Sequence, residues 1–386
     1  MAKSKPSLSF GFPRMHKEPA ERRDFLPDLI EHIAQRGCEV FVESGIGSGM
    51  SLCDEDYESR SPRVHVVDNL EAYRQDVVLV LRCPELDELC KLQRGATLMS
   101  MLHFPTRPRR VKRLLEQGLS AISLDSIVDD EGRRLVENMR AVGWNGVEAG
   151  FQALERTAPG LLTSARVVRV TVMGIGQVGK HAVEAATKYG DRRRAQQLIA
   201  AGAAGVEVVV VPRQLTCDER YMRARLSQTD MLVDSTQRAD PTTPLIPNAW
   251  LSELPAHAVV VDLVVDPYVL HVEPKTVRSI EGIPQGDLEQ YVFMPDDPAW
   301  DRSVPGSVPS KHRRATATCY SWPGVHPEAC MAHYGRQLAP LLDVVIRRGG
   351  GADLRAGDDA LERALSRAAL GAWAHTAAQA EREQED

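Results

Sequence analysis

The chain has 386 residues, of which 43% are hydrophobic and 26% are charged, and its formal net charge is −6. This length and composition are typical of a globular protein with two domains that each bury a core. The acidic balance and the lack of an apolar run of about 18 residues argue against nucleic acid and a membrane as partners, and without a signal-peptide core at its start we expect the chain to be cytoplasmic.

The first 135 residues alternate between strand-like and helix-like segments. Predicted strands lie at Leu8–Phe12, Glu39–Glu43, Val77–Leu81, Leu98–Leu102 and Ala121–Leu124, and predicted helices at Phe25–Arg36 and Arg109–Gln117. Runs that are mostly apolar, such as Val77–Leu81, are typical of strands covered on both faces. The alternation therefore predicts a parallel α/β sheet.

A long helix is predicted at Asn138–Leu154, leading into a second domain. It contains Gly143, Gly146 and Gly150, and each glycine costs a helix about 1 kcal/mol. Close packing against a neighbouring backbone is one reason for a helix to keep them.

A second series of strands follows, at Val167–Met173, Val206–Val211, Met231–Val233, Ala258–Val264 and Ala315–Tyr320. Pro295–Lys311 is rich in Pro, Asp and Ser and is predicted to be a loop. A helix at Pro327–Arg347 should end at the glycines that follow it. Asp358–Asp386 is predicted to be a surface helix. The seven cysteines are odd in number and form no CxxC pair, which favours reduced, mostly buried thiols over disulfides or a zinc site.

The most specific motif is the glycine-rich turn Gly174-Ile175-Gly176-Gln177-Val178-Gly179, which directly follows the strand Val167–Met173 and precedes a helix-compatible segment, Lys180–Lys188. In such a turn the first glycine makes the bend, the second lets a pyrophosphate approach the backbone, and the third lets the helix pack on the strand. The N–H groups and the dipole of the helix N-terminus then face the phosphates. The order strand, turn, helix predicts a dinucleotide site formed by Gly174, Gly176, Gln177, Val178 and Gly179.

One component of this motif is missing. An acidic residue at the end of the next strand normally binds the adenosine ribose, but Val206–Val211 is followed by Pro212 and Arg213. Arg213 is suited to a 2′-phosphate, which would mean NADP(H). Alternatively, Arg213 is a surface residue and the ribose has another partner, so NAD and NADP both remain open.

Several short segments share their order and spacing with one known family. They are Gly11-Phe12-Pro13 with Glu21-Arg22-Arg23, Val40–Gly45, Cys53–Tyr57, Leu102-His103, Asp125 with Asp130-Glu131-Gly132, Val259–Asp262 with Asp266, and Trp322-Pro323-Gly324. By these motifs the chain resembles the alanine dehydrogenase and transhydrogenase N-terminal family, which includes the lysine-forming saccharopine dehydrogenases. The resemblance runs from Gly11 to about Gly350.

The resemblance implies two Rossmann-like domains with parallel sheets, the dinucleotide domain being inserted into a discontinuous substrate domain. The substrate domain would comprise residues 1–138 together with the C-terminal helices at 325–386. The dinucleotide domain would comprise residues 139–324, with the active site in the cleft between them. Relatives are often oligomeric, so a homo-oligomer is expected.

The resemblance also implies roles for single residues. Arg23 would bind the substrate carboxylate, as a guanidinium does well, unless it pairs with Glu21 or Asp24 at the surface. His103 would be the general acid or base, since a histidine titrates near neutrality; alternatively it is a structural, hydrogen-bonded histidine. Asp266 would lie near the nicotinamide or the catalytic water, unless it is only a turn residue before Pro267.

This sequence departs from the family pattern where the family has its catalytic lysine. Arg82 stands at that position, and an arginine binds a carboxylate or carbonyl but stays charged and is a poor proton shuttle. His103 would then carry the proton chemistry alone. Met139 replaces a family serine, and Ser321-Trp322 precedes the final Pro-Gly, so the chain is a divergent member with a different substrate or an altered activity.

Three functions are consistent with these observations. The first is an NAD- or NADP-dependent oxidoreductase acting on the C–N bond of an amino acid, or of an imine formed from a 2-oxo acid, in the manner of alanine or saccharopine dehydrogenase. The second is a non-catalytic dinucleotide-binding protein, for which the Arg82 and Met139 departures are the only support. The third is a cyclodeaminase or other lyase that recycles the hydride of a bound cofactor.

Overall fold

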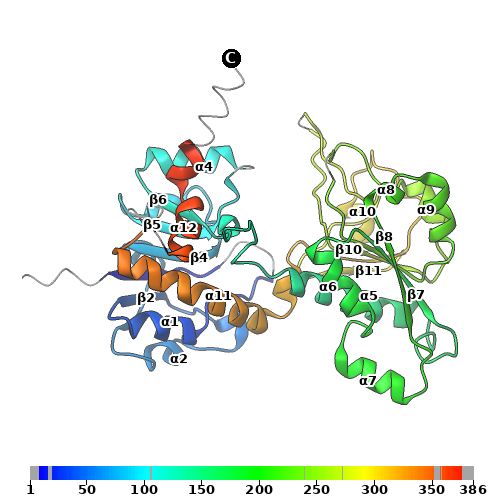
Figure 1. Ribbon diagram of the computed structural model, residues 1–386, viewed down its shortest axis with the longest axis horizontal. Coiled ribbons are helices and arrows are strands. Elements are labelled where there is room, and N and C mark those ends of the chain that lie inside the picture. Colours follow the sequence, from blue (N-terminus) through cyan, green and yellow to red (C-terminus); the bar gives the residue numbers. More distant parts are fainter. Residues whose placement is uncertain are drawn as a thin grey trace, which may run out of the picture. The chain divides into compact units, whose positions relative to one another are not determined.

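The structure is a computed structural model that describes residues 8–15, 20–104, 107–238, 240–271, 273–351, 357 and 359–375. The chain forms two compact units, each with its own sheet and helices (Figure 1). Unit 1 comprises residues 1–17, 21–137 and 326–386, and unit 2 comprises residues 18–20 and 138–325. The predicted fold class, two α/β domains with mostly parallel sheets, is confirmed.

The sheet of unit 1 has six parallel strands in the order β3-β2-β1-β4-β5-β6. They are β1 (Ser9–Phe12), β2 (Glu39–Glu43), β3 (Val64–Val67), β4 (Val77–Arg82), β5 (Thr97–Met101) and β6 (Ser120–Ser123). The five predicted strands are present, with ends shifted by one residue at most. The strand β3 was not predicted, because it is half-buried along most of its length and includes His65. The strand order reverses between β1 and β4, where open α/β sheets bind their ligands.

The helices of unit 1 include the C-terminal segment of the chain. They are α1 (Pro27–Ala34), α2 (Asp54–Glu58), α3 (Asn69–Tyr73), α4 (Pro108–Glu116), α11 (Pro327–Arg348) and α12 (Ala360–Arg367). The helix α11 packs beside α1, far from it in sequence (Figure 1). As predicted, α11 stops at a glycine, Gly349, whose φ is +72°. The prediction of a surface helix at Asp358–Asp386 was wrong for α12, which buries Ala364 and Leu365; residues 376–386 lie outside the described residues.

The sheet of unit 2 has the order β11-β12-β10-β9-β7-β8. Its strands are β7 (Val168–Met173), β8 (Val206–Val211), β9 (Met231–Asp234), β10 (Val259–Asp262), β11 (Val292–Phe293) and β12 (Ala315–Thr318). The two-residue strand β11 is antiparallel to β12, and the others are parallel. The five predicted strands are present, although β10 and β12 end two residues early. The short β11 was missed because two residues carry no periodicity.

The helices of unit 2 are α5 (Met139–Thr157), α6 (Gln177–Ala186), α7 (Arg192–Ala200), α8 (Arg213–Thr216), α9 (Glu219–Leu226) and α10 (Ala299–Ser303). The prediction that Pro295–Lys311 is entirely loop was wrong, because α10 forms around Trp300. This side chain is fully buried, and its indole N–H donates to the carbonyl of Gly282 at 3.0 Å. The helix predicted at Lys180–Lys188 begins earlier, at Gln177, directly on the glycine turn.

The glycines of α5 allow the helix to pack closely within unit 2. A Cβ atom at Gly143 would lie 2.8 Å from the backbone nitrogen of Ala182 in α6. One at Gly150 would lie 2.5 Å from a methyl group of Val261 in β10. Real Cβ atoms do not come this close, so both glycines serve close packing; the predicted approach to a neighbouring backbone is found at Gly143, whereas Gly150 packs against side chains.

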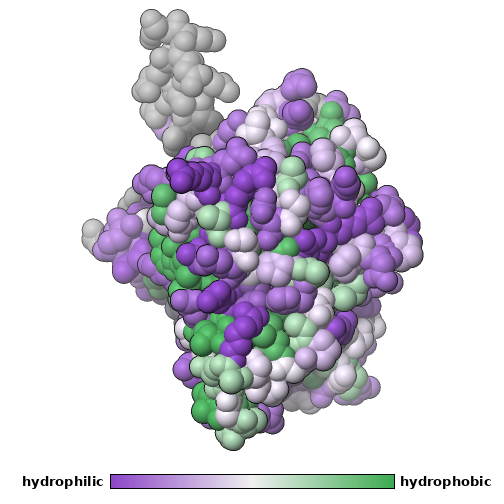
Figure 2. Space-filling model, turned by 90° about the vertical axis from the view of Figure 1, so that its right-hand side faces the viewer, coloured by the Kyte–Doolittle hydropathy of each residue, from purple (hydrophilic) through white to green (hydrophobic). Residues whose placement is uncertain are grey.

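The surface mixes polar and apolar side chains. On the face seen in Figure 2, hydrophilic residues are interspersed with smaller apolar patches. Among the described residues, no helix is both long enough and apolar enough to cross a membrane.

Candidate functional site

The glycine turn of unit 2 has the geometry of a phosphate-binding turn. Gly174 has a φ of +86°, in the region that favours glycine, and a Cβ atom there would lie 3.0 Å from the carbonyl oxygen of Ser235. A Cβ atom at Gly179 would lie 2.5 Å from the carbonyl oxygen of Gly174. These two glycines are therefore required by the turn and by the packing of α6 on β7.

Gly176 differs from them, because a Cβ atom there would meet nothing within 4 Å. Gly176 is the N-cap of α6, and no side chain caps this helix. The first N–H groups of α6, which include those of Gln177 and Val178, are thus left to an external acceptor. Open space beside uncapped N–H groups fits a dinucleotide pyrophosphate.

The strand tip next to this turn lacks a carboxylate. The N–H group of Gly174 donates to the carbonyl of Val211 at 3.0 Å, so the turn lies against the end of β8. Arg213 begins α8 two residues later and is exposed. The acidic residue of this strand, Glu207, lies near its other end and pairs with Arg169 at 3.4 Å. Arg213 is thus the charged side chain nearest in sequence to the ribose end of the site.

Two buried carboxylates end neighbouring strands of unit 2. Asp234 at the end of β9 and Asp262 at the end of β10 are directly paired in register. Burial and, next, the charge of Asp262 raise the pKa of Asp234 to about 6. The buried guanidinium of Arg278 forms an ion pair with Asp262 and donates to Thr318 Oγ1 at 2.8 Å. The sequence pattern did not single out Asp234 or Arg278; an acid that ends an apolar strand was the available signal for Asp234.

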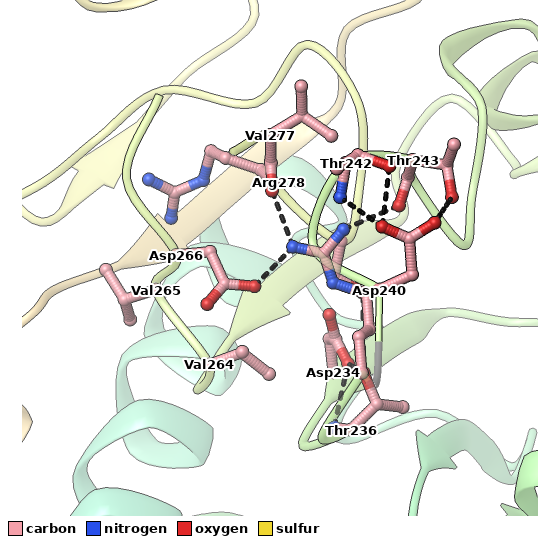
Figure 3. Close-up of polar contacts among 12 residues, drawn as sticks. Asp234, Thr236, Asp240, Thr242, Thr243, Val264, Val265, Asp266, Val277 and Arg278 are labelled. Atoms are coloured by element: carbon pink, nitrogen blue, oxygen red, sulfur yellow. Dashed lines mark hydrogen bonds and ion pairs between the residues drawn. The ribbon is translucent and has the colours of Figure 1, made fainter. Parts of the chain in front are cut away.

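Asp266, labelled in Figure 3, lies in the loop after β10 and forms an ion pair with Arg238. The side chain of Arg238 is 3% exposed, and its Nη2 atom lies 2.5 Å from Asp266 Oδ2. Arg238 also donates to the carbonyls of Thr243 and Val277. Val265, just before Asp266, has a φ of +56°, which is strained for a β-branched residue. Asp266 is therefore a fixed, ion-paired carboxylate rather than only a turn residue before Pro267.

In unit 1, His103 forms a pair with Asp125. The two residues follow β5 and β6, which are adjacent parallel strands. His103 Nδ1 lies 3.2 Å from Asp125 Oδ2, and the His103 N–H group donates to Asp125 Oδ1 at 3.2 Å. The histidine side chain is 52% exposed while that of the aspartate is 9% exposed. The ring is thus hydrogen-bonded, as the structural alternative expected, and also accessible, as a general acid or base must be, so its catalytic role stays a prediction.

Asp125 is an anion in this pair. Burial alone would raise its pKa, but hydrogen bonds from His103 and from Ser123, whose Oγ donates at 2.7 Å, outweigh burial and lower the pKa. The carboxylate thus fixes the orientation of the His103 ring and favours a proton on Nδ1. In the sequence, Asp125 stood out only within a family motif, with no role of its own.

Arg23 forms the ion pair that the sequence had left open. Its Nη2 and Nε atoms lie 2.6 Å and 2.9 Å from the carboxylate oxygens of Glu21. Burial would lower the pKa of Arg23, but Glu21 more than compensates and raises it. The pair is buried rather than at the surface. Binding of a substrate carboxylate by Arg23 remains a prediction.

Arg82 ends β4 and lines a pocket of about 330 Å³ within unit 1. The pocket opens where β1 and β4 diverge into loops, at the reversal of strand order. Both Arg82 and Arg23 act electrostatically on Tyr334 of α11: burial and then Cys330 raise the pKa of Tyr334, while the two arginines oppose this rise. The two predicted substrate arginines are therefore grouped around one helix of unit 1. His103 also belongs to unit 1, and Asp266, Arg213 and the glycine turn belong to unit 2.

Comparisons with known proteins show which proteins the chain is similar to. Residues 13–140 match the family model described as "Alanine dehydrogenase/PNT, N-terminal domain". An alanine dehydrogenase of Halomonas elongata is 26% identical over 287 residues, which cover 67% of this chain and 73% of that enzyme. The NAD(P) transhydrogenase subunit alpha of Haemophilus influenzae is 22% identical over 190 residues, covering 47% of this chain and 37% of that protein.

Among solved structures, one titled L-alanine dehydrogenase superposes with a TM-score of 0.70 at 20% identity, covering 94% of each chain. At this identity the superposition shows a shared fold. Apart from the Halomonas enzyme, the chain spans about half the length of the first curated relatives that it matches.

Proposed function

Through residues 13–140 the chain belongs to the alanine dehydrogenase/PNT family, and we propose that it is an NAD- or NADP-dependent oxidoreductase. Its reaction would be at the C–N bond of an amino acid, or of an imine formed from a 2-oxo acid and an amine. The names of its relatives, alanine dehydrogenase and NAD(P) transhydrogenase, support this class of reaction. A bound nicotinamide supplies or accepts the hydride, and the protein supplies binding, orientation and electrostatics.

The dinucleotide is proposed to bind on the glycine turn of unit 2. The uncapped N–H groups at the start of α6 would donate to the pyrophosphate, and Gly176 leaves the room for it. Arg213 is the candidate partner of the adenosine ribose or its 2′-phosphate.

The proton is proposed to move through His103. Reduction of a C=N bond takes a hydride to carbon and a proton to nitrogen, and the reverse reaction returns both. His103 is half-exposed and its Nδ1 is held by Asp125, so Nε2 would be the atom that exchanges the proton with the substrate. Asp125 keeps the ring in the orientation that directs Nε2 away from the carboxylate.

The substrate carboxylate is proposed to bind to Arg82, with Arg23 nearby. Arg82 keeps its charge at any physiological pH, so it serves binding and polarisation and leaves proton transfer to His103. Asp266 would lie on the nicotinamide side, where its carboxylate, fixed by the ion pair with Arg238, would accept a hydrogen bond from the cofactor or the catalytic water.

The open position at Gly176 carries this proposal, because it can be closed without disturbing the protein. We expect Gly176→Val to abolish the binding of NADH and NADPH, since its Cβ atom meets no protein atom within 4 Å and the side chain would occupy the place proposed for the pyrophosphate. Gly306→Val is the matched control: Gly306 also has open space around its Cβ position and an unstrained φ. Fluorescence titration of both variants checks the expectation, and unchanged cofactor binding in Gly176→Val would contradict the proposed site.

Turnover is the second half of the test. A screen of 2-oxo acids with amines, followed by the absorbance of the reduced cofactor, should show consumption of NADH or NADPH. Tight cofactor binding without turnover of any pair would instead favour a non-catalytic dinucleotide-binding protein.

A further inference from the structure

The loop that carries Asp266 is contacted at both of its ends by one buried arginine, Arg278. We propose that Arg278 is a positioning residue for the reaction: acting through Asp262, it holds the loop Leu263–Pro267 in the strained conformation that presents the Asp266 carboxylate. The role of Asp266 rests on the proposed function. The coupling of Arg278 to the loop rests only on contacts within unit 2.

Asp262 fixes the first part of the loop. Its Oδ1 atom accepts the backbone N–H groups of Val264 at 2.9 Å and of Val265 at 3.0 Å. A carboxylate that accepts the N–H groups of residues shortly after it ties the chain into a turn. The direction in which the next residue, Asp266, leaves the turn is therefore set by Asp262.

Val265 adopts an unfavourable backbone conformation in this turn. Its φ is +56°, in the left-handed region that a β-branched residue rarely occupies. The conformation is unfavourable because the Cβ atom lies too close to the following carbonyl oxygen. The two hydrogen bonds to Asp262 oppose relaxation of Val265 to a negative φ, which would move the Asp266 carboxylate.

Arg278 in turn fixes the Asp262 carboxylate. The two side chains form an ion pair between Arg278 Nη2 and Asp262 Oδ2, and they are 1% and 4% exposed. The same Nη2 atom donates to Thr318 Oγ1 at 2.8 Å, which ties the pair to β12. Because Arg278 binds Oδ2, the other oxygen of Asp262 is left for the N–H groups of the loop.

Arg278 also contacts the far end of the loop. Val269 and Thr276 donate their N–H groups to each other's carbonyls at 2.9 Å and 2.8 Å, which brings Arg278 back near Asp266 (Figure 3). The central carbon of its guanidinium lies 5.8 Å from the centre of the Tyr268 ring, within the range of a cation–π interaction. One side chain therefore contacts a residue on each side of the loop.

The neighbouring carboxyl group of Asp234 does not hold the loop. Asp234 is in register with Asp262, but its Oδ1 atom accepts the N–H group of Thr236 at 3.0 Å and the Thr236 hydroxyl at 2.7 Å. Its Oδ2 atom has no hydrogen-bond partner in the described part of the chain. The link between Arg278 and the loop therefore runs through Asp262.

The chemistry of the ion pair favours a role in positioning over a role in stability. The Nε and Nη1 atoms of Arg278 are buried, and neither has a hydrogen-bond partner among the described residues. A buried ion pair gains little net stability, and apolar side chains often replace one without loss. The benefit of an arginine at this place is therefore geometric, because it holds one carboxylate at a fixed point beside the loop.

The first arm of the test follows the loop and needs no substrate. Hydrogen exchange of the full chain, read by mass spectrometry, should be faster in Arg278→Met by about tenfold in peptides that contain Val264 and Val265, because local opening exposes their N–H groups. Exchange at the glycine turn Gly174–Gly179 should not change.

Arg314→Met is the matched control. Arg314 is a half-buried arginine of unit 2 that donates to the carbonyls of Leu254 and Pro255. It directly precedes β12, at the opposite edge of the sheet from Asp262. This variant should leave the exchange of the loop unchanged.

The second arm measures turnover. Misplacing a reacting group by about 1 Å can cost about 100-fold in rate, so we expect Arg278→Met to lower kcat by about 10- to 100-fold. The dissociation constant of NADH should stay unchanged, because the glycine turn is not altered. Circular dichroism gives the folded fraction by which kcat is corrected. Arg278→Lys, which keeps the charge beside Asp262, should retain more of kcat than Arg278→Met does.

A second substitution in the Arg278→Met variant distinguishes positioning from folding. Glycine adopts a positive φ freely, so adding Val265→Gly should recover part of the lost kcat. Adding Val265→Ala is the control, because alanine also removes the valine methyl groups but keeps the Cβ atom and hence the strain. If glycine and alanine have the same effect on kcat, Arg278 acts on folding alone and the positioning role is refuted.

The outcomes separate this inference from the proposed function. Faster exchange of the loop in Arg278→Met, without turnover of any 2-oxo acid and amine, would support the coupling and remove the oxidoreductase proposal. Turnover by the unchanged protein, with the same loop exchange and the same kcat in folded Arg278→Met, would refute the positioning role and leave the oxidoreductase proposal standing. If Arg278→Met does not fold, Arg278→Lys takes its place in both arms, and an unchanged loop and kcat there would refute the role equally.

Discussion

Both units place their first strand where the strand order of the sheet reverses, but they carry different residues at the end of that strand. In each, the first strand, β1 or β7, lies inside a six-stranded sheet, and the chain passes from one side of it to the other. The carboxyl edge at this reversal is where α/β sheets bind ligands. In unit 2 this edge carries glycines and uncapped backbone N–H groups. In unit 1 the corresponding edge carries the side chains of Arg14 and Arg82.

The difference follows from what comes after each first strand. After β7, Gly174 and Gly176 bring the backbone itself to the ligand, which suits the pyrophosphate common to all dinucleotides. After β1, Pro13 and Arg14 leave no glycine turn, so this edge presents long charged side chains in place of backbone N–H groups. The fold thus provides the location of a site, and the local sequence decides its chemistry.

The largest predicted effect tests whether proton transfer depends on unit 1 while cofactor binding depends on unit 2. His103→Ala should lower kcat by 10²- to 10⁴-fold, the usual contribution of general acid–base catalysis. It should leave the NADH dissociation constant unchanged, because the glycine turn lies in unit 2. Steady-state kinetics and fluorescence titration of the same preparation check both statements. Unchanged turnover would remove the role proposed for His103.

A companion variant, Asp125→Asn, tests the carboxylate behind the histidine. Because the pKa of Asp125 is lowered in the folded protein, this group stabilises the fold above the ordinary aspartate pKa of about 3.9, and the stabilisation is lost as the pH falls through the lower folded value. Asp125→Asn should therefore remove part of the acid sensitivity of unfolding and lower kcat less than His103→Ala does. If the stability of Asp125→Asn fell with decreasing pH as steeply as that of the unchanged protein, the pairing of Asp125 with His103 would be contradicted.

The second largest effect concerns the stability of unit 2. The pKa of Asp234 is raised to about 6 by burial and by Asp262, so the folded state holds this proton more tightly than the unfolded state. The sign follows from linkage: stability falls as the pH rises from about 4 to about 6. Asp234→Asn should abolish that slope. Urea unfolding of both proteins at several pH values checks it, and equal slopes would show that Asp234 is charged in the fold.

The sequence was sufficient where function depends on local backbone. The glycine turn could be predicted because strand, turn and helix are consecutive, and the glycines of α5 because each is costly unless packing requires it. His103 and Arg82 were found through motifs that follow single strands. The open alternative for Arg23, pairing with Glu21, was visible because the two residues are two positions apart.

Contacts between distant segments could not be predicted in this way. Lys91, which follows β4, donates through Nζ to Asn69 Oδ1 of α3 at 2.5 Å, and neither residue belongs to a motif. Arg238 reaches Asp266 across 28 positions, and Arg278 reaches Asp262 from a loop without periodicity. Such pairs depend on tertiary packing, which composition and spacing do not encode locally.

The third predicted effect tests the ion pair between Arg238 and Asp266. Arg238→Gln removes the partner of Asp266 and two hydrogen bonds to the carbonyls of Thr243 and Val277. Removing one partner of a buried ion pair is strongly destabilising, and since Asp266 is 29% exposed we expect about 2 kcal/mol. Turnover should fall by more than the loss of folded protein accounts for, because Asp266 is no longer held in position. Arg238→Lys, which keeps the charge, is the control, and equal effects of both variants would show that only the fork geometry of the arginine matters.

The smallest predicted effect tests which residue of unit 2 distinguishes NADPH from NADH. Pyrophosphate recognition by N–H groups does not distinguish NADH from NADPH, so discrimination falls to a side chain at the tip of β8, where Arg213 is exposed and no carboxylate precedes it. We expect Arg213→Gln to weaken NADPH binding about tenfold, or about 1.4 kcal/mol, and NADH binding less than twofold. Arg220→Gln, an exposed arginine on the next helix, is the control. An equal loss for both cofactors would mean that Arg213 contacts the shared pyrophosphate, and no loss would make it a surface residue. In either case Arg213 would not be the residue that distinguishes NADPH from NADH.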